Sequence, residues 1–363
     1  MIQEYGYEYH AVKNGVLLAE AGWRSTDSTL WGAYCMRSGR DALKAIARMH
    51  AGARVYLPAL CCNSMITPFE SYRCEIVFYP LTEALTADYP ALCRLMEDSR
   101  GDTLLLYYDY FGIPMLSPDG IRELRTMQRE LSVIRDTTHT LLADGAPSPL
   151  NDYTVASLRK WTSLPDGGLL FTERYVAPAE WREDSRFAEQ RLEAQVLRTR
   201  FFETGDGEIK CRYRQMFASV SEFLDSEPHP VRMTEYSYRL AALTDWEALR
   251  RTRRENADLL REAFRNADGI HLIDDGARES NLYVPILVEN RDEIQALLSR
   301  KGIFNTVIWP LREAQMQACE NAAAVSKKML AVPCDQRYSK EDILHISREI
   351  TRTVHEKNND SRC

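Results

Sequence analysis

Short apolar runs alternate with amphipathic stretches through the first half of the chain, and this alternation constrains the fold more than any other feature. The runs "ARVYLP", "DTLLLYYDYFG" and "SVIRD" have the length and the aromatic or β-branched content of strands. Between such runs, segments such as "SGRDALKAIARMH" place apolar residues at helical spacing. Strands separated by helices pair in parallel, because a parallel connection needs a long crossover. The sequence therefore predicts an α/β sandwich with a mainly parallel sheet.

The second half of the chain predicts a smaller α+β lobe. Its runs "SNLYVPILV" and "RDEIQALLSRKGI" again alternate strand and helix patterns, and 363 residues suit two lobes better than one. We place a large domain at residues 1–240 and a small carboxyl-terminal domain at 241–363. The charged, helix-like stretch 175–217 is expected to form a helical spacer or a dimer-facing arm, and the arginine run 250–254 a solvated helix face.

Bulk composition excludes several classes of function. A formal charge of −7 gives no overall attraction to nucleic acid or to an anionic membrane surface. No apolar stretch reaches 18 residues, and the acidic, tyrosine-rich start is unlike a secretory signal. The nine cysteines have neither disulfide-framework nor zinc-site spacing, so we expect reduced thiols in a cytoplasmic protein and no metal site.

Groups that could form a site follow the predicted strands. Asp136 comes directly after "SVIR", with His139 three residues further on, and Lys160 follows "TVASL", with Ser157 three residues before it. The helix start Ser38-Gly39-Arg40 offers free backbone N–H groups. Ligands of open α/β sheets gather at the carboxyl ends of the strands, so these groups are expected to meet there.

This set of groups suits pyridoxal 5′-phosphate (PLP). A helix N-terminus can bind the phosphate, and the Ser157 hydroxyl can add a donor. Lys160 would form a Schiff base through a neutral amine, and Asp136 would keep the pyridine nitrogen protonated. Taken singly, each residue has a more ordinary interpretation: a turn or cap aspartate, a solvated lysine, a core histidine. The order and spacing of the whole set favour the cofactor.

The motifs in this order resemble those of the DegT/StrS family of fold-type-I PLP-dependent sugar aminotransferases. The resemblance runs from about residue 30 to about residue 350. Its most specific parts are Asp136 followed by His139, and Lys160 followed by the pair Gly167-Gly168. The segments that carry it are "SGRDALKAI", "VYLPALCCNSMITPF", "YYDYFGIPM", "VIRDTTHTLL", "SLRKWTSLPDGGLLFT", "GIFNTVIWPL" and "LAVPCDQRYSKEDI".

The resemblance implies a fold-type-I three-layer sandwich and a role for each site residue. Lys160 would be the Schiff-base lysine and proton shuttle, and Asp136 the pyridine-nitrogen partner. The remaining implied roles are His139 beside the ring hydroxyl, Ser157 and the turn Ser38-Gly39-Arg40 at the phosphate, Cys62 at the position that stacks on the ring, and Trp309 near the sugar.

The chain departs from the family pattern at three positions. Val155 stands where the family has a serine five residues before the lysine, and Cys62 replaces an aromatic residue. The family's asparagine from the partner subunit has no match near "HPVRMTEYS", where Thr234 or Ser237 could substitute. The resemblance therefore implies the role of Lys160 more directly than it implies the contacts to the phosphate and to a partner subunit.

The activity implied is transfer of an amino group from glutamate to a nucleotide-linked keto sugar by a homodimer, feeding polysaccharide or glycoconjugate biosynthesis. A cyclitol or another ketone as acceptor is an alternative that sequence does not separate. Sugar dehydratases that resemble this family replace the lysine by histidine, so Lys160 speaks against that activity. A non-catalytic binding protein with this fold is a further alternative. A nicotinamide dehydrogenase is disfavoured because no GxGxxG follows a strand.

Overall fold

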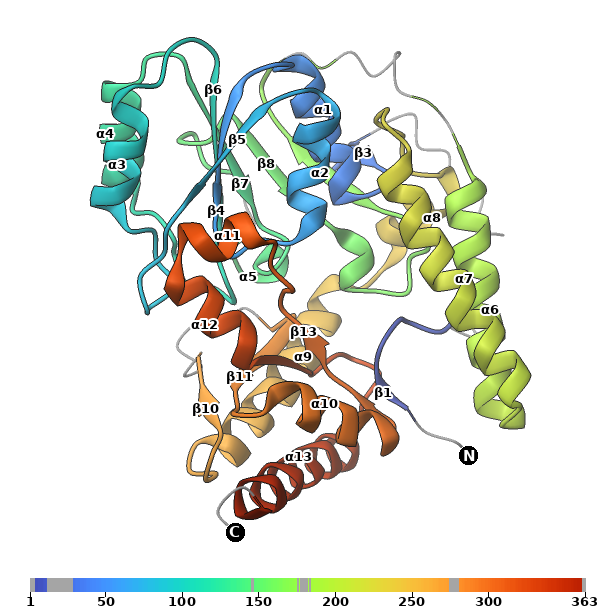
Figure 1. Cartoon of the computed structure of the whole chain (residues 1–363). Coiled ribbons are helices and arrows are strands. Elements are labelled where there is room, and N and C mark those ends of the chain that lie inside the picture. The colour runs from blue at the N-terminus through green and yellow to red at the C-terminus, as the bar shows by residue number, and fades with distance from the viewer. Residues whose placement is uncertain are drawn as a thin grey trace.

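The computed structural model describes residues 4–11, 29–144, 147–174, 176, 182, 184–273 and 281–360. An eight-stranded sheet forms the upper part of the molecule in Figure 1, and a four-stranded sheet with its helices lies below it. Two separate sets of buried apolar residues, one on each sheet, make the main cores. The fold-type-I expectation of a mainly parallel sheet and a smaller α+β part is confirmed. The division at residue 240 stays a prediction.

The large sheet has the order β2-β3-β9-β8-β7-β6-β4-β5. Neighbours from β8 across to β5 run parallel, and β9 is antiparallel to both β8 and β3. Strand β6 is buried at all six positions, as expected where helices cover both faces. The strands are β2 (Thr29–Leu30), β3 (Ala33–Met36), β4 (Arg54–Pro58), β5 (Glu75–Tyr79), β6 (Thr103–Tyr108), β7 (Leu131–Asp136), β8 (Tyr153–Ala156) and β9 (Gly168–Phe171).

Helices connect these strands, and α1, α3 and α4 start at residues whose side chains cap them. Ser38, Asp88 and Ser117 each accept a hydrogen bond from a backbone N–H of the following first turn. The helices are α1 (Gly39–Met49), α2 (Asn63–Ser71), α3 (Tyr89–Glu97), α4 (Pro118–Met127) and α5 (Leu141–Asp144), with the short 3₁₀ turn η2 at Leu158–Lys160.

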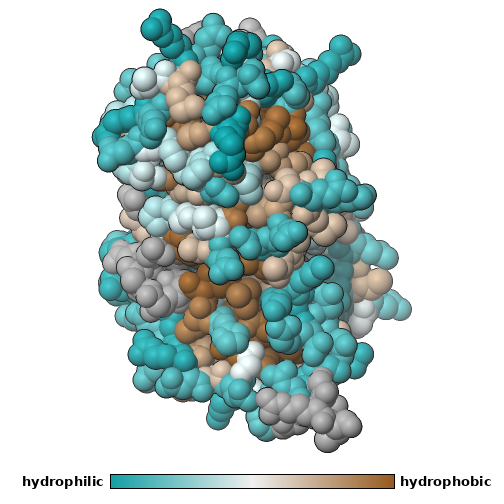
Figure 2. Space-filling model, turned by 60° about the vertical axis from the view of Figure 1, so that its left-hand side comes forward, coloured by the Kyte–Doolittle hydropathy of each residue, from teal (hydrophilic) through white to brown (hydrophobic). Residues whose placement is uncertain are grey.

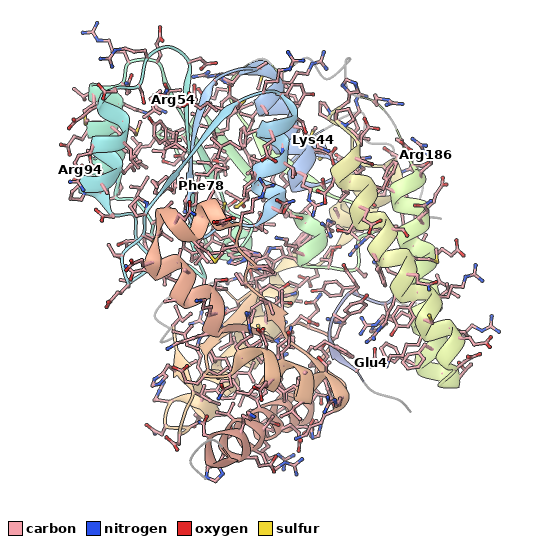
Figure 3. The ribbon with its side chains drawn as sticks, viewed as in Figure 1. Glu4, Lys44, Arg54, Phe78, Arg94 and Arg186 are labelled. Carbon is pink, nitrogen blue, oxygen red and sulfur yellow. The ribbon has the colours of Figure 1, made fainter. Side chains whose placement is uncertain are left out.

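Two long helices, α6 (Arg186–Thr204) and α7 (Gly207–Ser226), pack side by side at the right of Figure 1. The predicted helical stretch is therefore broken in two. The break lies at Gly205, whose φ of 71° ends α6 in the left-handed region, and at Asp206, whose side chain caps α7. Lys44 on α1, labelled in Figure 3, ties the sheet to this pair by donating to the carbonyl of Leu224 at 2.8 Å.

The small sheet has the order β10-β11-β14-β13 and is antiparallel throughout. Figure 2 shows apolar residues gathered along the middle of one face of the molecule, between hydrophilic ends. The remaining elements are α8 (Glu235–Leu243), α9 (Trp246–Phe264), β10 (His271–Leu272), β11 (Tyr283–Leu287), α10 (Arg291–Arg300), β12 (Ile303–Phe304), β13 (Thr306–Val307), α11 (Glu313–Ala318), α12 (Glu320–Lys328), β14 (Met329–Pro333) and α13 (Lys340–Asp360).

The first described residues lie against the lower part of the molecule, although they were assigned to the large domain. Strand β1 (Tyr5–Gly6) pairs in parallel with β12, and Tyr5 belongs to the core of the small sheet. Glu4, labelled in Figure 3, lies 2.6 Å from Lys210 Nζ on α7. The amino-terminal segment thus connects the small sheet with the α6–α7 pair.

Candidate active site

One cavity at the carboxyl ends of the parallel strands collects nearly all the predicted site residues. It lies between the start of α1, the loop after β4, the ends of β6 and β7, and the η2 turn that follows β8. Its lining residues are Ser38, Gly39, Arg40, Leu43, Cys62, Ser64, Met65, Tyr108, Asp136, Thr138, Ser157, Arg159, Lys160 and Trp309. Their roles in cofactor binding stay predictions; their convergence is a property of the fold.

Asp136 is the last residue of β7 and is buried with 7% exposure. Strand pairing places it between Tyr108 on β6 and Val155 on β8. Its Oδ1 accepts a 2.8 Å hydrogen bond from the backbone N–H of Thr138. Burial raises the pKa of this carboxyl group, while the Thr138 hydrogen bonds and the charge of Lys160 favour its ionised form.

Lys160 ends the η2 turn, and the backbone N–H of Leu158 fixes that turn by donating to the Gly167 carbonyl at 3.1 Å. Burial lowers the pKa of the Lys160 amine, and Arg159 and Arg40 lower it further, against the opposing effects of Cys62 and Asp136. A lysine in such surroundings is neutral for a larger fraction of time than a solvated lysine, as a nucleophilic amine requires.

Close packing against the start of α1 explains why position 168 is a glycine, and a positive φ explains the glycine at position 167. A Cβ on Gly168 would lie 2.2 Å from the carbonyl carbon of Ser38 and 2.6 Å from the nitrogen of Gly39. Gly167 has φ +145° and donates its N–H to the Arg37 carbonyl at 2.7 Å. The pair therefore lets the start of α1 lie against β9, next to the turn that carries Lys160.

The start of α1 presents donors to the cavity. Ser38 caps the helix by accepting from the Asp41 N–H at 3.2 Å, and the N–H groups of Gly39 and Arg40 have no acceptor within the helix by its geometry. Ser157 lies beside this turn, since a Cβ on Gly39 would be 3.5 Å from the Ser157 Cβ. The Arg40 guanidinium is held from outside by Asp225, at 2.9 Å.

His139 lies behind the cavity wall and is not one of its lining residues. Its ring stacks on Trp309 with centroids 5.9 Å apart, and it packs edge-on against Tyr108 at 4.7 Å. Burial, assisted by the charge of Lys160, holds its pKa well below the usual 6.5, so this imidazole is neutral. Trp309 lines the cavity as expected, and Tyr108 is an aromatic wall residue that the sequence analysis did not select.

The support behind Lys160 comes from a residue that the sequence did not point to. The arginine run 250–254 on α9 is not wholly solvated as predicted. Arg253 is buried with 1% exposure, while Arg251 and Arg254 are exposed. Its guanidinium donates to the Trp161 carbonyl at 3.1 Å and lies 4.9 Å from the Trp161 ring centroid. A signal was present: residue 253 shares the helical stripe of Leu249, Asn256 and Leu260, which are buried or nearly so.

Trp161 joins the two halves of the site. Its indole Nε1 donates to the Thr138 carbonyl at 2.9 Å, which ties the Lys160 turn to the loop that follows Asp136. Its carbonyl also accepts from Tyr9 at 3.0 Å and from Gln336 at 3.0 Å. Contacts from α9 and from the amino-terminal segment therefore hold the Lys160 turn, which is tied to the loop that follows Asp136.

Thr234 and Ser237, named above as substitutes for the missing asparagine, and Cys62 each lie close to other residues of this chain. Thr234 donates through its hydroxyl to Asp166 at 2.8 Å and caps α8, and Ser237 is buried beside it. The Cys62 thiol lies 2.9 Å from the Ser64 hydroxyl at the cavity.

Among the described residues, no cluster of histidine, cysteine and carboxylate side chains could hold a metal ion. None of the helices in the described ranges is long and apolar enough to cross a membrane.

The donor set of the cavity fits PLP. An amine whose pKa is lowered by burial and a buried carboxyl group lie at one cavity, and free backbone N–H groups of a helix start lie at the same cavity. The buried Nε atoms of Arg40 and Arg159 make no hydrogen bond to any described residue. Unsatisfied donors next to a helix N-terminus are what a bound anion would satisfy.

Comparison with known proteins agrees with this geometry. Residues 223–351 match the sequence model of the DegT/DnrJ/EryC1/StrS aminotransferase family. No curated protein matches the chain significantly.

Solved structures of sugar aminotransferases share the fold. A putative sugar aminotransferase from Streptococcus pneumoniae, Spr1654 in its PLP form, is 18% identical with a TM-score of 0.70, covering 98% of this chain and 99% of the other. PseC of Helicobacter pylori, an aminotransferase of pseudoaminic acid biosynthesis, is 15% identical with a TM-score of 0.68, covering 98% and 100%. DesI, solved with its TDP-sugar product, is 16% identical with a TM-score of 0.65, covering 91% and 82%.

These likenesses establish the fold, and the family match confirms the resemblance drawn from the motifs. The family is one of PLP-dependent aminotransferases, and Spr1654 has been solved in both its PLP and its pyridoxamine phosphate forms. The expectations of a sugar-aminotransferase family and of PLP as its cofactor are thereby confirmed. The substrate, the amino donor and the assembly belong to the proposal below.

Proposed function

We propose that this chain is a PLP-dependent aminotransferase that moves an amino group from glutamate to a nucleotide-linked keto sugar, for polysaccharide or glycoconjugate biosynthesis in the cytoplasm. The observation that carries the proposal is the convergence of Lys160 and Asp136 on one cavity that also receives the start of α1. Bound there, the cofactor would supply an electron sink for the carbon from which a proton is removed. The chain's own residues supply position, charge and proton transfer.

Lys160 is the residue proposed to hold the cofactor covalently and then to move the proton. Its lowered pKa increases the fraction of free amine that can accept a proton. Because the η2 turn is fixed through Gly167 and Trp161, the amine is delivered to the cavity without a large search of conformations.

Asp136 is the residue proposed to pair with the protonated ring nitrogen. The Thr138 N–H orients the carboxylate, and burial strengthens its interaction with a cation that enters the cavity. His139 stays neutral beside it, so it adds no competing positive charge. Ser157 and the α1 start are proposed to bind the phosphate, and Trp309 to contact the sugar.

The structural relatives support the acceptor class. DesI was solved with its TDP-sugar product, and PseC is an aminotransferase involved in the biosynthesis of pseudoaminic acid. We propose a homodimer, and the apolar residues gathered on the face in Figure 2 are compatible with a subunit interface. We also propose that residues 1–240 and 241–363 form the large and small domains. Light scattering on the purified protein tests the dimer.

The decisive experiment reduces the purified protein with borohydride and locates the cofactor adduct by mass spectrometry. We expect the adduct on Lys160, a half-reaction with glutamate, and product with one or more nucleotide-linked keto sugars in an acceptor panel that includes a cyclitol ketone. Lys160→Ala should lose adduct and turnover, whereas the exposed Lys327→Ala should keep both. An adduct elsewhere, or amination in the Lys160→Ala protein, contradicts the proposal; cofactor without a half-reaction favours a binding protein.

A further inference from the structure

The cavity contains a second cation that the proposed function does not yet use. Arg159 lines it directly beside Lys160. Its side chain makes no hydrogen bond or ion pair with any residue in the described part of the chain, and its Nε is buried. Arg159 as a whole is half-buried, whereas two fully buried arginines of the described ranges are paired: Arg37 with Asp41 at 2.8 Å and Arg191 with Glu8 at 2.5 Å.

An unpartnered guanidinium in a partly closed site is costly. Burial and the nearby positive charges of Arg191 and Arg40 lower the pKa of Arg159 to about 9. Glu8 and Tyr283 act in the opposite direction but do not cancel this effect. Removing a charge from water without a partner costs free energy, and the cost is recovered when an anion binds. Arg159 is therefore arranged for a ligand that the protein chain does not supply.

The position of Arg159 selects the kind of anion. The cavity has an acidic side at Asp136, whose main charged neighbours are Lys160 and Asp109. The same cavity is lined by Arg159 and by Arg40, which is close enough to Arg159 to lower its pKa, and by Ser157 and the α1 start with its free N–H groups. The planar fork of a guanidinium matches a phosphate with two parallel hydrogen bonds, and a helix start adds further donors to the same oxygens.

We infer that Arg159 binds the phosphate group of the cofactor, together with the start of α1 and Ser157. The inference rests on the proposed function and assigns one further binding residue to it. Lys160 holds the aldehyde end of the cofactor, so Arg159, one residue earlier on the same 3₁₀ turn, is placed to hold its anionic end. The turn would then fix both ends of one small molecule.

The inference is tested by the affinity of the cofactor-free protein for PLP and for pyridoxal, which lacks the phosphate. In Arg159→Met we expect PLP binding, followed by absorbance, to weaken roughly 10- to 100-fold, as loss of a charged hydrogen-bonded contact implies. Pyridoxal binding should be unchanged. Arg159→Lys should recover part of the loss. Arg122→Met, which removes an exposed arginine on α4, serves as the matched control and should bind both compounds as wild type does.

Stability separates a ligand-binding role from a structural one. Because Arg159 forms no hydrogen bond or ion pair with a described residue, the cofactor-free Arg159→Met protein should melt at or above the temperature of wild type. Inorganic phosphate should raise the melting temperature of the wild type and not that of Arg159→Met.

Three outcomes would overturn the inference. They are an unchanged PLP affinity, an equal loss for PLP and pyridoxal, and a defect confined to the KM for glutamate or sugar. Failure of the wild-type protein to bind PLP at all would instead remove the proposed function, so the two failures are distinguishable.

Discussion

Replacing Gly168 by alanine tests how the glycine pair builds the site. The added methyl carbon would lie 2.2 Å from the carbonyl carbon and 2.4 Å from the carbonyl oxygen of Ser38, and 2.6 Å from the nitrogen of Gly39. All three atoms are backbone, so no side-chain rotation can relieve the contact. Ordinary contact begins at 3.4 Å, and either the start of α1 or strand β9 must therefore move by about 1 Å.

This displacement should cost both stability and affinity. Overpacking against fixed atoms costs about 1–3 kcal/mol and sometimes more, and a backbone clash belongs at the upper end, near 3 kcal/mol. The displaced atoms carry the N–H groups proposed to bind phosphate. Misplacing groups that bind and orient a reactant by about 1 Å can cost about 100-fold, so we expect PLP affinity to fall by roughly 10- to 100-fold.

The assay is urea unfolding of the cofactor-free protein, followed by PLP titration of each folded variant. Gly207→Ala is the control, because Gly207 is the first residue of α7 and a Cβ there meets nothing within 4 Å. That variant should be neutral or more stable by up to about 1 kcal/mol, with unchanged PLP affinity. A Gly168→Ala protein with the urea midpoint and PLP affinity of wild type would refute the steric reasoning.

Three further predictions follow from buried groups. Asp136→Asn should still fold but lose at least about 100-fold in turnover, measured with saturating PLP, because an amide cannot keep the ring nitrogen charged. Arg253→Met should lower the free energy of unfolding by about 1–3 kcal/mol, measured by urea, because the Leu282 carbonyl loses its donor and the Trp161 carbonyl keeps only Tyr9 and Gln336. Burial, with help from Arg337, lowers the pKa of His10 from 6.5 to about 4. Between these two values the unfolded chain takes up a proton that the folded chain excludes. The free energy of unfolding should therefore fall as pH drops from about 6.5 to about 4, and it should fall less in His10→Gln.

Local pattern determined the elements that carry the site. The strand run that ends at Asp136 and the helix that begins after Ser38 have the predicted bounds within about two residues, since periodicity and capping residues act over neighbouring positions. The same reasoning placed Asp136 and Lys160 at one edge of the sheet, because strand ends of a parallel sheet share an edge. The described part of the predicted helical stretch 175–217 forms two helices, because Gly205 in the left-handed region ends α6.

Tertiary structure alone decided which charges are buried and what they contact. Arg253 and Arg254 are adjacent and chemically identical, yet the former donates to the Trp161 carbonyl and the latter is exposed. The pairing of Tyr5 with Ile303 joins residues about 300 positions apart, and no local pattern encodes it. The steric need for Gly168 likewise appears only once Ser38 lies against it. Burial and long-range contact depend on the packing of distant segments, whereas strand, helix and turn depend on neighbours along the chain.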